Sequence, residues 1–199
     1  MNYDLQEDNR AMLPWGSRLR DDLGISAAES QSLATSIFND VSELSDDVKA
    51  NQLSDLLTFG ERFNELALFM NYLADRQSSG NISVIEGHAH VVLSSYLCFV
   101  YLGDACFIRL RKLVPSGSVS KKCFKFLTEN PVRAFRNAVA HANWKVEDRR
   151  IVFWARKGSD ENEPLVEFTV DDSDRAFWFF LSLCAAKATY AALTSRSTR

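Results

Sequence analysis

The chain has 199 residues, of which 46% are hydrophobic and 12% aromatic, so it can bury a full core, and this length is typical of one domain. Its net charge of -3 argues against a protein that coats nucleic acid by bulk positive charge, although it leaves room for a local basic site. The polar, acidic start MNYDLQEDNR lacks the character of a signal or transit peptide, and no stretch offers roughly 18 uninterrupted apolar residues for a membrane span. We therefore expect a soluble cytoplasmic protein with no membrane partner.

Hydrophobic spacing in the first half of the chain predicts helices after a loosely packed N-terminal segment at residues 1–30. Apolar residues recur at helical spacing over 32–44 and again over 53–75, which indicates two helices. The polar run QSSGN at 77–81 breaks the pattern. Residues 84–113 are too apolar for a surface helix, so we expect them to form a helix through the core.

The second half predicts three more helices and one hairpin. A short helix is expected over 121–128, and Pro131, which is tolerated in a first helical turn, begins another. The β-branched and aromatic runs at 150–155 and 165–170 flank the polar loop RKGSDENEP, which indicates a β-hairpin. The acids of DDSD suit a helix N-terminus and precede a last helix over 176–193. We expect a mainly α bundle, a single domain at 31–199, with a small β-hairpin at about 146–170 inserted before the last helix.

Neither the cysteines nor the histidines predict a metal site. The four cysteines are scattered through apolar surroundings without short paired spacings, which favours reduced core thiols: Cys98, Cys106, Cys123 and Cys184. His88 and His90 lie two residues apart, so on a helix their side chains point about 200° apart and cannot bind one ion. The sequence predicts no metal and no cofactor.

Charge is distributed unevenly along the chain. The segment 109–150 carries eleven basic residues and three acidic ones, so the rest of the chain carries the acidic excess. Solvated helix faces would explain this segment, and so would a binding site for a polyanion.

Within that segment, the stretch PVRAFRNAVAHANW at 131–144 places polar side chains among small apolar residues. On a helix, Arg133, Asn137 and His141 form one stripe, while Arg136 lies about 140° from His141. Trp144 and the strand expected near Val146 imply that the helix ends around His141. Unwinding there could bring Arg136 and His141 to one place, and such helix ends often serve function.

The string RNAVAH, from Arg136 to His141, resembles the R-x(4-6)-H motif of the HEPN superfamily of helical nucleotide- and RNA-binding proteins. The polar Asn137 after Arg136, the helical core, and the hairpin before a last helix fit the same pattern. The hairpin is similar to that of a plasmid- and mobile-element-associated branch. The resemblance implies a HEPN-like helical bundle over roughly 53–193, with motifs from two protomers meeting across a homodimer cleft.

Metal-independent RNA cleavage is the activity that this resemblance implies. His141 would deprotonate the ribose 2′-hydroxyl or protonate the leaving 5′-oxygen, and Arg136 would stabilise charge on the phosphoryl oxygens. Asn137 would orient His141 or bond the phosphate. The product would be a 2′,3′-cyclic phosphate, and DNA would resist because it lacks the 2′-hydroxyl.

Further candidates surround this motif. Arg133 and Lys145 are candidate substrate-binding residues, and Asp104 is a candidate supporting carboxylate, because an acid in a core helix needs a partner such as Arg136 or His141. Glu86 is a weaker candidate of the same kind. The same residues also have structural interpretations: a histidine favoured by the helix C-terminus, an arginine holding a carboxylate, and solvated surface charges.

Three classes of function remain open from the sequence. The first is an RNA endonuclease of toxin or antiphage defence type. The second is a HEPN-like module that binds RNA or nucleotide without cleaving, or that acts as the partner of a nucleotidyltransferase or another antitoxin. The third is a structural dimer in which the basic segment is only a solvated face.

Overall fold

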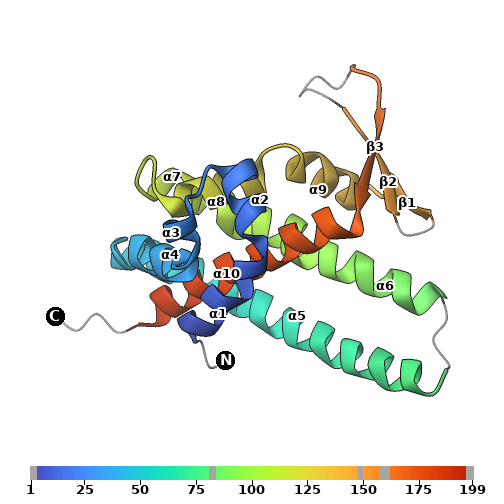
Figure 1. The fold of residues 1–199 in the computed structure, drawn as a ribbon, viewed down its shortest axis with the longest axis horizontal. Helices are drawn as coiled ribbons and strands as arrows, with labels where there is room; N and C mark the ends of the chain where they lie inside the picture. Colours follow the sequence, from blue (N-terminus) through green and yellow to red (C-terminus); the bar gives the residue numbers. More distant parts are fainter. Residues whose placement is uncertain (1–3, 81–83, 148–149, 157–161, 196–199) are drawn as a thin grey trace.

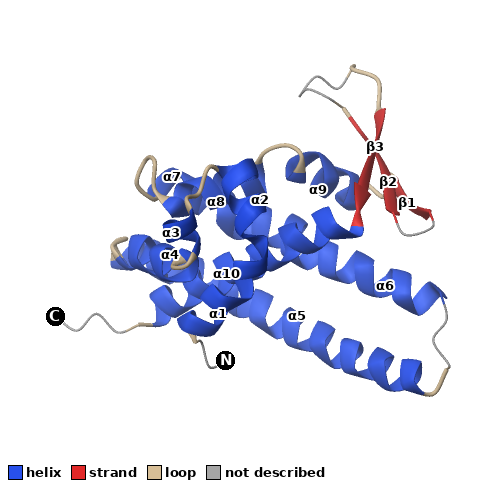
Figure 2. Cartoon of the chain, viewed as in Figure 1, coloured by secondary structure: helices blue, strands red, loops and turns tan. Residues whose placement is uncertain are grey.

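The computed structural model describes residues 4–80, 84–147, 150–156 and 162–195. Within these residues the protein is mainly helical, with a small three-stranded sheet at one end of the helical body (Figure 1). Figure 2 separates the two classes of structure and shows that the strands project from the body beside α9 (Val132–Ala140). The expectation of a mainly α fold is confirmed.

The N-terminal segment is packed, and the prediction of loose packing over 1–30 was wrong. Met12, Leu19 and Ile25 are fully buried in the core. The Asn9 side chain bonds both the Thr35 hydroxyl and the Ala34 backbone N–H, which ties the segment to the next helix. The segment consists of the short helices α1 (Leu5–Met12), η1 (Leu13–Trp15), α2 (Gly16–Leu23) and α3 (Ala27–Ser30). It leads into α4 (Leu33–Ser42), which matches the helix expected over 32–44.

Two long helices, α5 (Asp46–Ser78) and α6 (Val84–Ser95), extend side by side away from the body (Figure 1). The chain then continues through two π-helical stretches, η2 (Tyr96–Tyr101) and η3 (Gly103–Phe107), into α7 (Ile108–Leu113). The predicted core helix over 84–113 is therefore present, but its middle is wound more widely than an α-helix. π-Helical turns of this kind occur often at functional sites.

The sheet is antiparallel and follows chain order, from β1 (Trp144–Glu147) through β2 (Arg150–Ala155) to β3 (Val166–Asp171). The predicted hairpin is confirmed, with Phe153 paired opposite Phe168, and β1 adds a third strand. Residues 157–161 of the predicted loop lie outside the described residues. The last helix, α10 (Asp172–Thr194), is capped by Asp171, whose carboxylate accepts the Asp174 backbone N–H at 2.9 Å.

One hydrophobic core joins these elements, and α10 runs through its middle. An aromatic cluster links η2, α9 and the sheet to α10, because the Phe135 ring contacts those of Phe99, Phe153 and Trp178. On α8 (Val119–Thr128), the Phe126 ring contacts that of Phe177 on α10. All four cysteines are free and buried, as predicted, and burial raises the pKa of their thiols, that of Cys123 to about 12. Such thiols behave as small apolar side chains.

Two helical stretches, Ala89–Leu113 and Asp172–Thr194, are long and apolar enough to cross a membrane by length and composition. Within their most apolar windows, 44% of the first and 61% of the second lie buried inside the protein. A helix that runs through the core of a globular protein has the same composition. Both stretches contribute fully buried side chains to the common core, Leu102 and Leu181 among them.

Candidate functional site

A hollow of about 350 Å³ opens between α9 and the end of β2. Its charged lining comes from three arginines, Arg133, Arg136 and Arg156, together with His141. The remaining polar lining consists of the amides Asn130, Asn137 and Asn143, and Trp154 adds an aromatic ring. No carboxylate lines the hollow among the described residues. This composition suits an anion, and we call the cavity the cationic hollow.

Arg136 is the most constrained of these cations. Its side chain is only 13% exposed, and Nη1 lies 2.9 Å from Asp104 Oδ1. The pairing with Asp104 was predicted, but the physical reason is reversed, because Asp104 is 61% exposed and the arginine is the buried partner. Nη2 also donates to the Asn137 side-chain oxygen at 3.2 Å. The guanidinium is therefore oriented before any ligand arrives.

Gly103 makes room for this arginine, and sequence reasoning missed it. A Cβ at Gly103 would lie 3.3 Å from Arg136 Cδ, which is tighter than most Cβ contacts, and 3.5 Å from Nη1, which is an ordinary contact. The glycine begins the π-helical stretch η3, which also carries Asp104. A glycine directly before an acid inside an apolar run was the available signal, since glycine in a helix often marks close approach.

His141 lies at the C-cap of α9, where the helix was predicted to end. The following residue, Ala142, has a left-handed backbone with φ +57°, and its N–H donates to the Val139 carbonyl. The Asn143 N–H reaches back to the Ala138 carbonyl at 2.9 Å. These two bonds form a Schellman motif, which closes the helix and turns the chain toward β1. Arg136 and His141 thus line one hollow, and no hydrogen bond fixes the imidazole among the described residues.

We expect replacement of Ala142 by glycine to stabilise the protein by about 1 kcal/mol, because glycine carries no left-handed penalty at this position. Thermal unfolding would then shift upward by about 2–4 °C. Ala140→Gly, two residues earlier and inside α9, is the matched control and should lower stability by a similar amount. A melting temperature that falls for both variants would contradict the strained cap.

The two predicted substrate-binding residues, Arg133 and Lys145, lie in different places in the structure. Arg133 lines the hollow, half-buried, and makes no ion pair or hydrogen bond to any described residue. Lys145 lies on β1, outside the lining. It is paired with Glu147, and its ammonium is 5.3 Å from the centre of the Trp154 ring. Arg133 is therefore available to an anion, whereas Lys145 already has a carboxylate partner and lies outside the lining.

Arg156 was missed, because it lies beyond the basic segment and enters the hollow only through the fold of the sheet. Its Nε donates to the Glu163 backbone carbonyl at 3.0 Å, which leaves its charge uncompensated by that bond. Conversely, much of the basic segment points elsewhere and is paired with acids from α3, α5 or the end of α8. These pairs are Arg109 with Asp55, Arg111 with Glu129, and Lys122 with Glu29.

The remaining sequence candidates lie apart from the hollow. Burial lowers the pKa of His90, and the charge of Arg175 lowers it further. The side chains of Glu86 and His88 lie outside the described residues. Among the side chains that the structure describes, no three histidines, cysteines or acids are grouped as metal ligands would be.

Comparison of the chain with protein-family models, curated proteins and solved structures gave no significant match. The chemistry of the hollow must therefore be argued from its own residues. Three guanidinium groups and three amides present donors suited to phosphate oxygens, and the His141 imidazole beside them is a group able to accept or donate a proton.

Proposed function

We propose that the protein is a metal-independent RNA endonuclease of HEPN type, acting as a toxin or a defence effector. The observation that supports this proposal most directly is the hollow itself. Arg136 and His141, predicted as a pair from the sequence, line it together with Arg133 and Arg156. An RNA phosphate seated there would meet donors on several sides and no repelling carboxylate among the described lining residues.

The proposed reaction needs a base, an acid and a cation. His141 accepts the proton of the ribose 2′-hydroxyl, and the 2′-oxygen attacks the adjacent phosphorus. Arg136 stabilises the negative charge that develops on the non-bridging oxygens. The P–O5′ bond breaks, the 5′-oxygen takes a proton, and the products are a 2′,3′-cyclic phosphate and a 5′-hydroxyl. Across a homodimer cleft, the second protomer's copy of His141 supplies that proton.

Asp104 acts on this reaction through Arg136. Its carboxylate holds Nη1 at 2.9 Å, so the guanidinium fork keeps one orientation. The amide of Asn137 accepts from Nε and Nη2 at 3.4 and 3.2 Å, which are long contacts to a neutral group. A phosphate oxygen would replace that amide readily, because a charged acceptor binds guanidinium more strongly.

Exposed apolar side chains on α6 and η2 support a homodimer. Leu93 on α6 and Tyr96 on η2 are 46% and 50% exposed and lie three residues apart. We expect Leu93→Asp to shift the protein from dimer to monomer in sedimentation velocity, since a buried unpaired charge opposes association. Leu113→Asp, at an equally exposed leucine of α7, is the control and should leave the dimer intact. A monomeric wild type would contradict the dimer.

The direct test is incubation of a mixed set of labelled single-stranded RNAs with the protein in excess chelator, beside DNA of the same sequences. We expect RNA to be cut and DNA to remain whole. Intact RNA at high protein concentration, with dimer formed, would contradict the nuclease.

A second function is favoured by two observations. Arg136 is already paired with Asp104, and no described residue orients the His141 imidazole. Both suit a module that binds RNA or nucleotide without cleaving it, or the regulatory partner of a nucleotidyltransferase. Tight, salt-dependent RNA binding without cleavage would select this function.

The salt dependence of RNA affinity measures how many phosphates the protein neutralises. For single strands, each neutralised phosphate contributes about -0.7 to the slope of log affinity against log salt concentration. We expect Arg133→Gln to reduce the slope by about 0.7, because Arg133 has no competing partner among the described residues. Arg62→Gln, an exposed cation paired with Glu65 on α5, is the matched control and should leave the slope unchanged. Equal slopes for both variants would place the phosphate away from Arg133.

A further inference from the structure

A second hollow, of about 380 Å³, lies between α2, the start of α9, the β2–β3 pair and the first turns of α10. Asn130, which precedes α9, lines both this hollow and the cationic one. The two cavities therefore adjoin at that residue.

The walls of the second hollow are aromatic. Phe153 and Phe168 are paired across β2 and β3, and their rings are stacked with centroids 5.4 Å apart and an angle of 20°. Trp178 and Phe126 complete the aromatic lining. Phe153 and Trp178 are buried, whereas Phe126 and Phe168 are only half-buried. The two half-buried rings, Phe126 and Phe168, are therefore the ones that offer a stacking surface to another planar ring.

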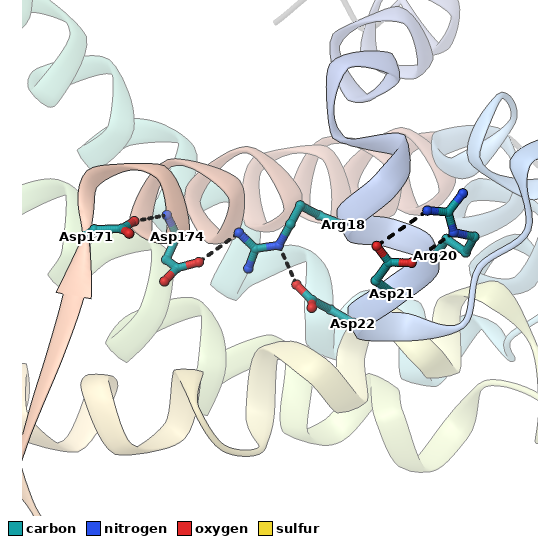
Figure 3. Close-up of polar contacts among 6 residues, drawn as sticks. All are labelled: Arg18, Arg20, Asp21, Asp22, Asp171 and Asp174. Carbon is teal, nitrogen blue, oxygen red and sulfur yellow. Dashed lines mark hydrogen bonds and ion pairs between the residues drawn. The ribbon is translucent and has the colours of Figure 1, made fainter.

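The charged part of the same hollow is a pair of carboxylates joined by one arginine (Figure 3). Arg18 Nε lies 2.7 Å from an Asp22 oxygen, and its Nη1 lies 2.7 Å from an Asp174 oxygen. Each carboxylate has a second oxygen, and no described residue donates to either. The hollow thus combines stacking walls with two free, partly solvent-shielded acceptors.

We propose that this second hollow binds a nucleobase and prefers guanine, an inference that rests on the proposed RNA function. Guanine presents an imino N–H and an amino group along one edge, which are two donors for the two carboxylate oxygens that Arg18 leaves free, one on Asp22 and one on Asp174. Uracil presents a single donor and gains less. In this arrangement the base lies in the second hollow, and Asn130, which lines both cavities, stands between it and a phosphate beside Arg133 and Arg136. The arrangement makes Asp22 and Phe168 specificity-determining residues.

The test uses nucleosides, which carry no phosphate and contain no bond that the enzyme would cut. Binding of guanosine, inosine and uridine is measured by NMR titration in chelator. Inosine differs from guanosine only in lacking the amino group. We expect guanosine to bind about tenfold or more tightly than inosine or uridine, because each omitted hydrogen bond to a charged group weakens binding by that order.

Two variants and one control locate the site. Asp22→Asn should bring guanosine to the affinity of inosine, and Phe168→Leu, which keeps an apolar side chain, should weaken all three nucleosides. Asp21→Asn alters an exposed neighbour that pairs with Arg20 outside the hollow, so it should change nothing (Figure 3). Thermal melts establish that each variant is folded.

Equal affinity for the three nucleosides, or guanosine binding that survives both Asp22→Asn and Phe168→Leu, would overturn the base-binding proposal. If the Arg18 pairs with Asp22 and Asp174 serve only to hold α2 against α10, Asp22→Asn will lower stability without changing nucleoside affinity, and that result would also overturn the proposal. RNA cleavage without guanine preference would overturn this inference and leave the nuclease standing. Guanosine binding without RNA cleavage would overturn the nuclease and leave this inference standing.

Discussion

Replacing His141 by alanine should lower the rate of RNA cleavage by about 10²- to 10⁴-fold, the usual contribution of a positioned general acid or base. Arg136→Ala should cost about 10²- to 10³-fold, as loss of one group that stabilises developing charge does. His141 is exposed at the end of α9, so its removal leaves the fold intact. Single-turnover cleavage of one labelled RNA measures both losses.

The two variants should also differ in binding. His141→Ala should keep its affinity for an uncleavable 2′-deoxy analogue, whereas Arg136→Ala should bind that analogue more weakly, because the guanidinium contacts the phosphate before and during the reaction. Arg62→Gln, at an exposed arginine paired on α5, is the control and should behave as wild type. Unchanged cleavage by His141→Ala would refute its role as acid or base.

The second large effect concerns stability, and in particular the packing of α9, the helix that carries Arg136 on one side of the hollow. We expect Phe135→Ala to lower the free energy of unfolding by about 3–5 kcal/mol, the range for deleting a buried phenylalanine side chain. Phe135 is fully buried on the inner face of α9, and its ring contacts those of Phe99, Phe153 and Trp178. A cavity there would detach α9 from both the core and the sheet. Urea denaturation measures the loss.

The control is the same chemical change at an exposed ring. Phe180 is 43% exposed on α10, so Phe180→Ala should cost about 1 kcal/mol or less. A loss of equal size in the two variants would mean that the aromatic cluster does not hold α9 in place. If Phe135→Ala is too unstable to purify, Phe135→Leu should show a smaller loss in the same direction.

The long elements of the fold were predictable because their side chains repeat over many turns. The apolar stretch at 84–113 and the two hairpin strands each carry enough apolar residues to identify them as helix or strand. The N-terminal helices were not predictable in this way. Each spans eight residues or fewer, so Met12 and Leu19 show no period, and their burial depends on packing against distant helices. The π-helical stretches were also hidden, because residue type alone does not specify a wider turn.

The candidate site was predictable where residues are close in sequence. Arg136, Asn137 and His141 share one helix, so their spacing places them near one another. Arg156 directly follows β2, fifteen or more residues later, and only the fold brings it to α9. That Lys145 pairs with an acid and does not line the hollow could have been foreseen. Residues two apart on a strand share a face, and Glu147 lies two residues after Lys145 on β1.

The most direct test of the proposed chemistry is cleavage of a DNA strand that contains one ribonucleotide, in excess chelator. The account predicts a single cut on the 3′ side of that ribonucleotide, leaving a 2′,3′-cyclic phosphate and a 5′-hydroxyl, and no cut in the His141→Ala variant. A cut at any other position, or products bearing a 5′-phosphate, would contradict attack by the 2′-hydroxyl and with it the assigned role of His141.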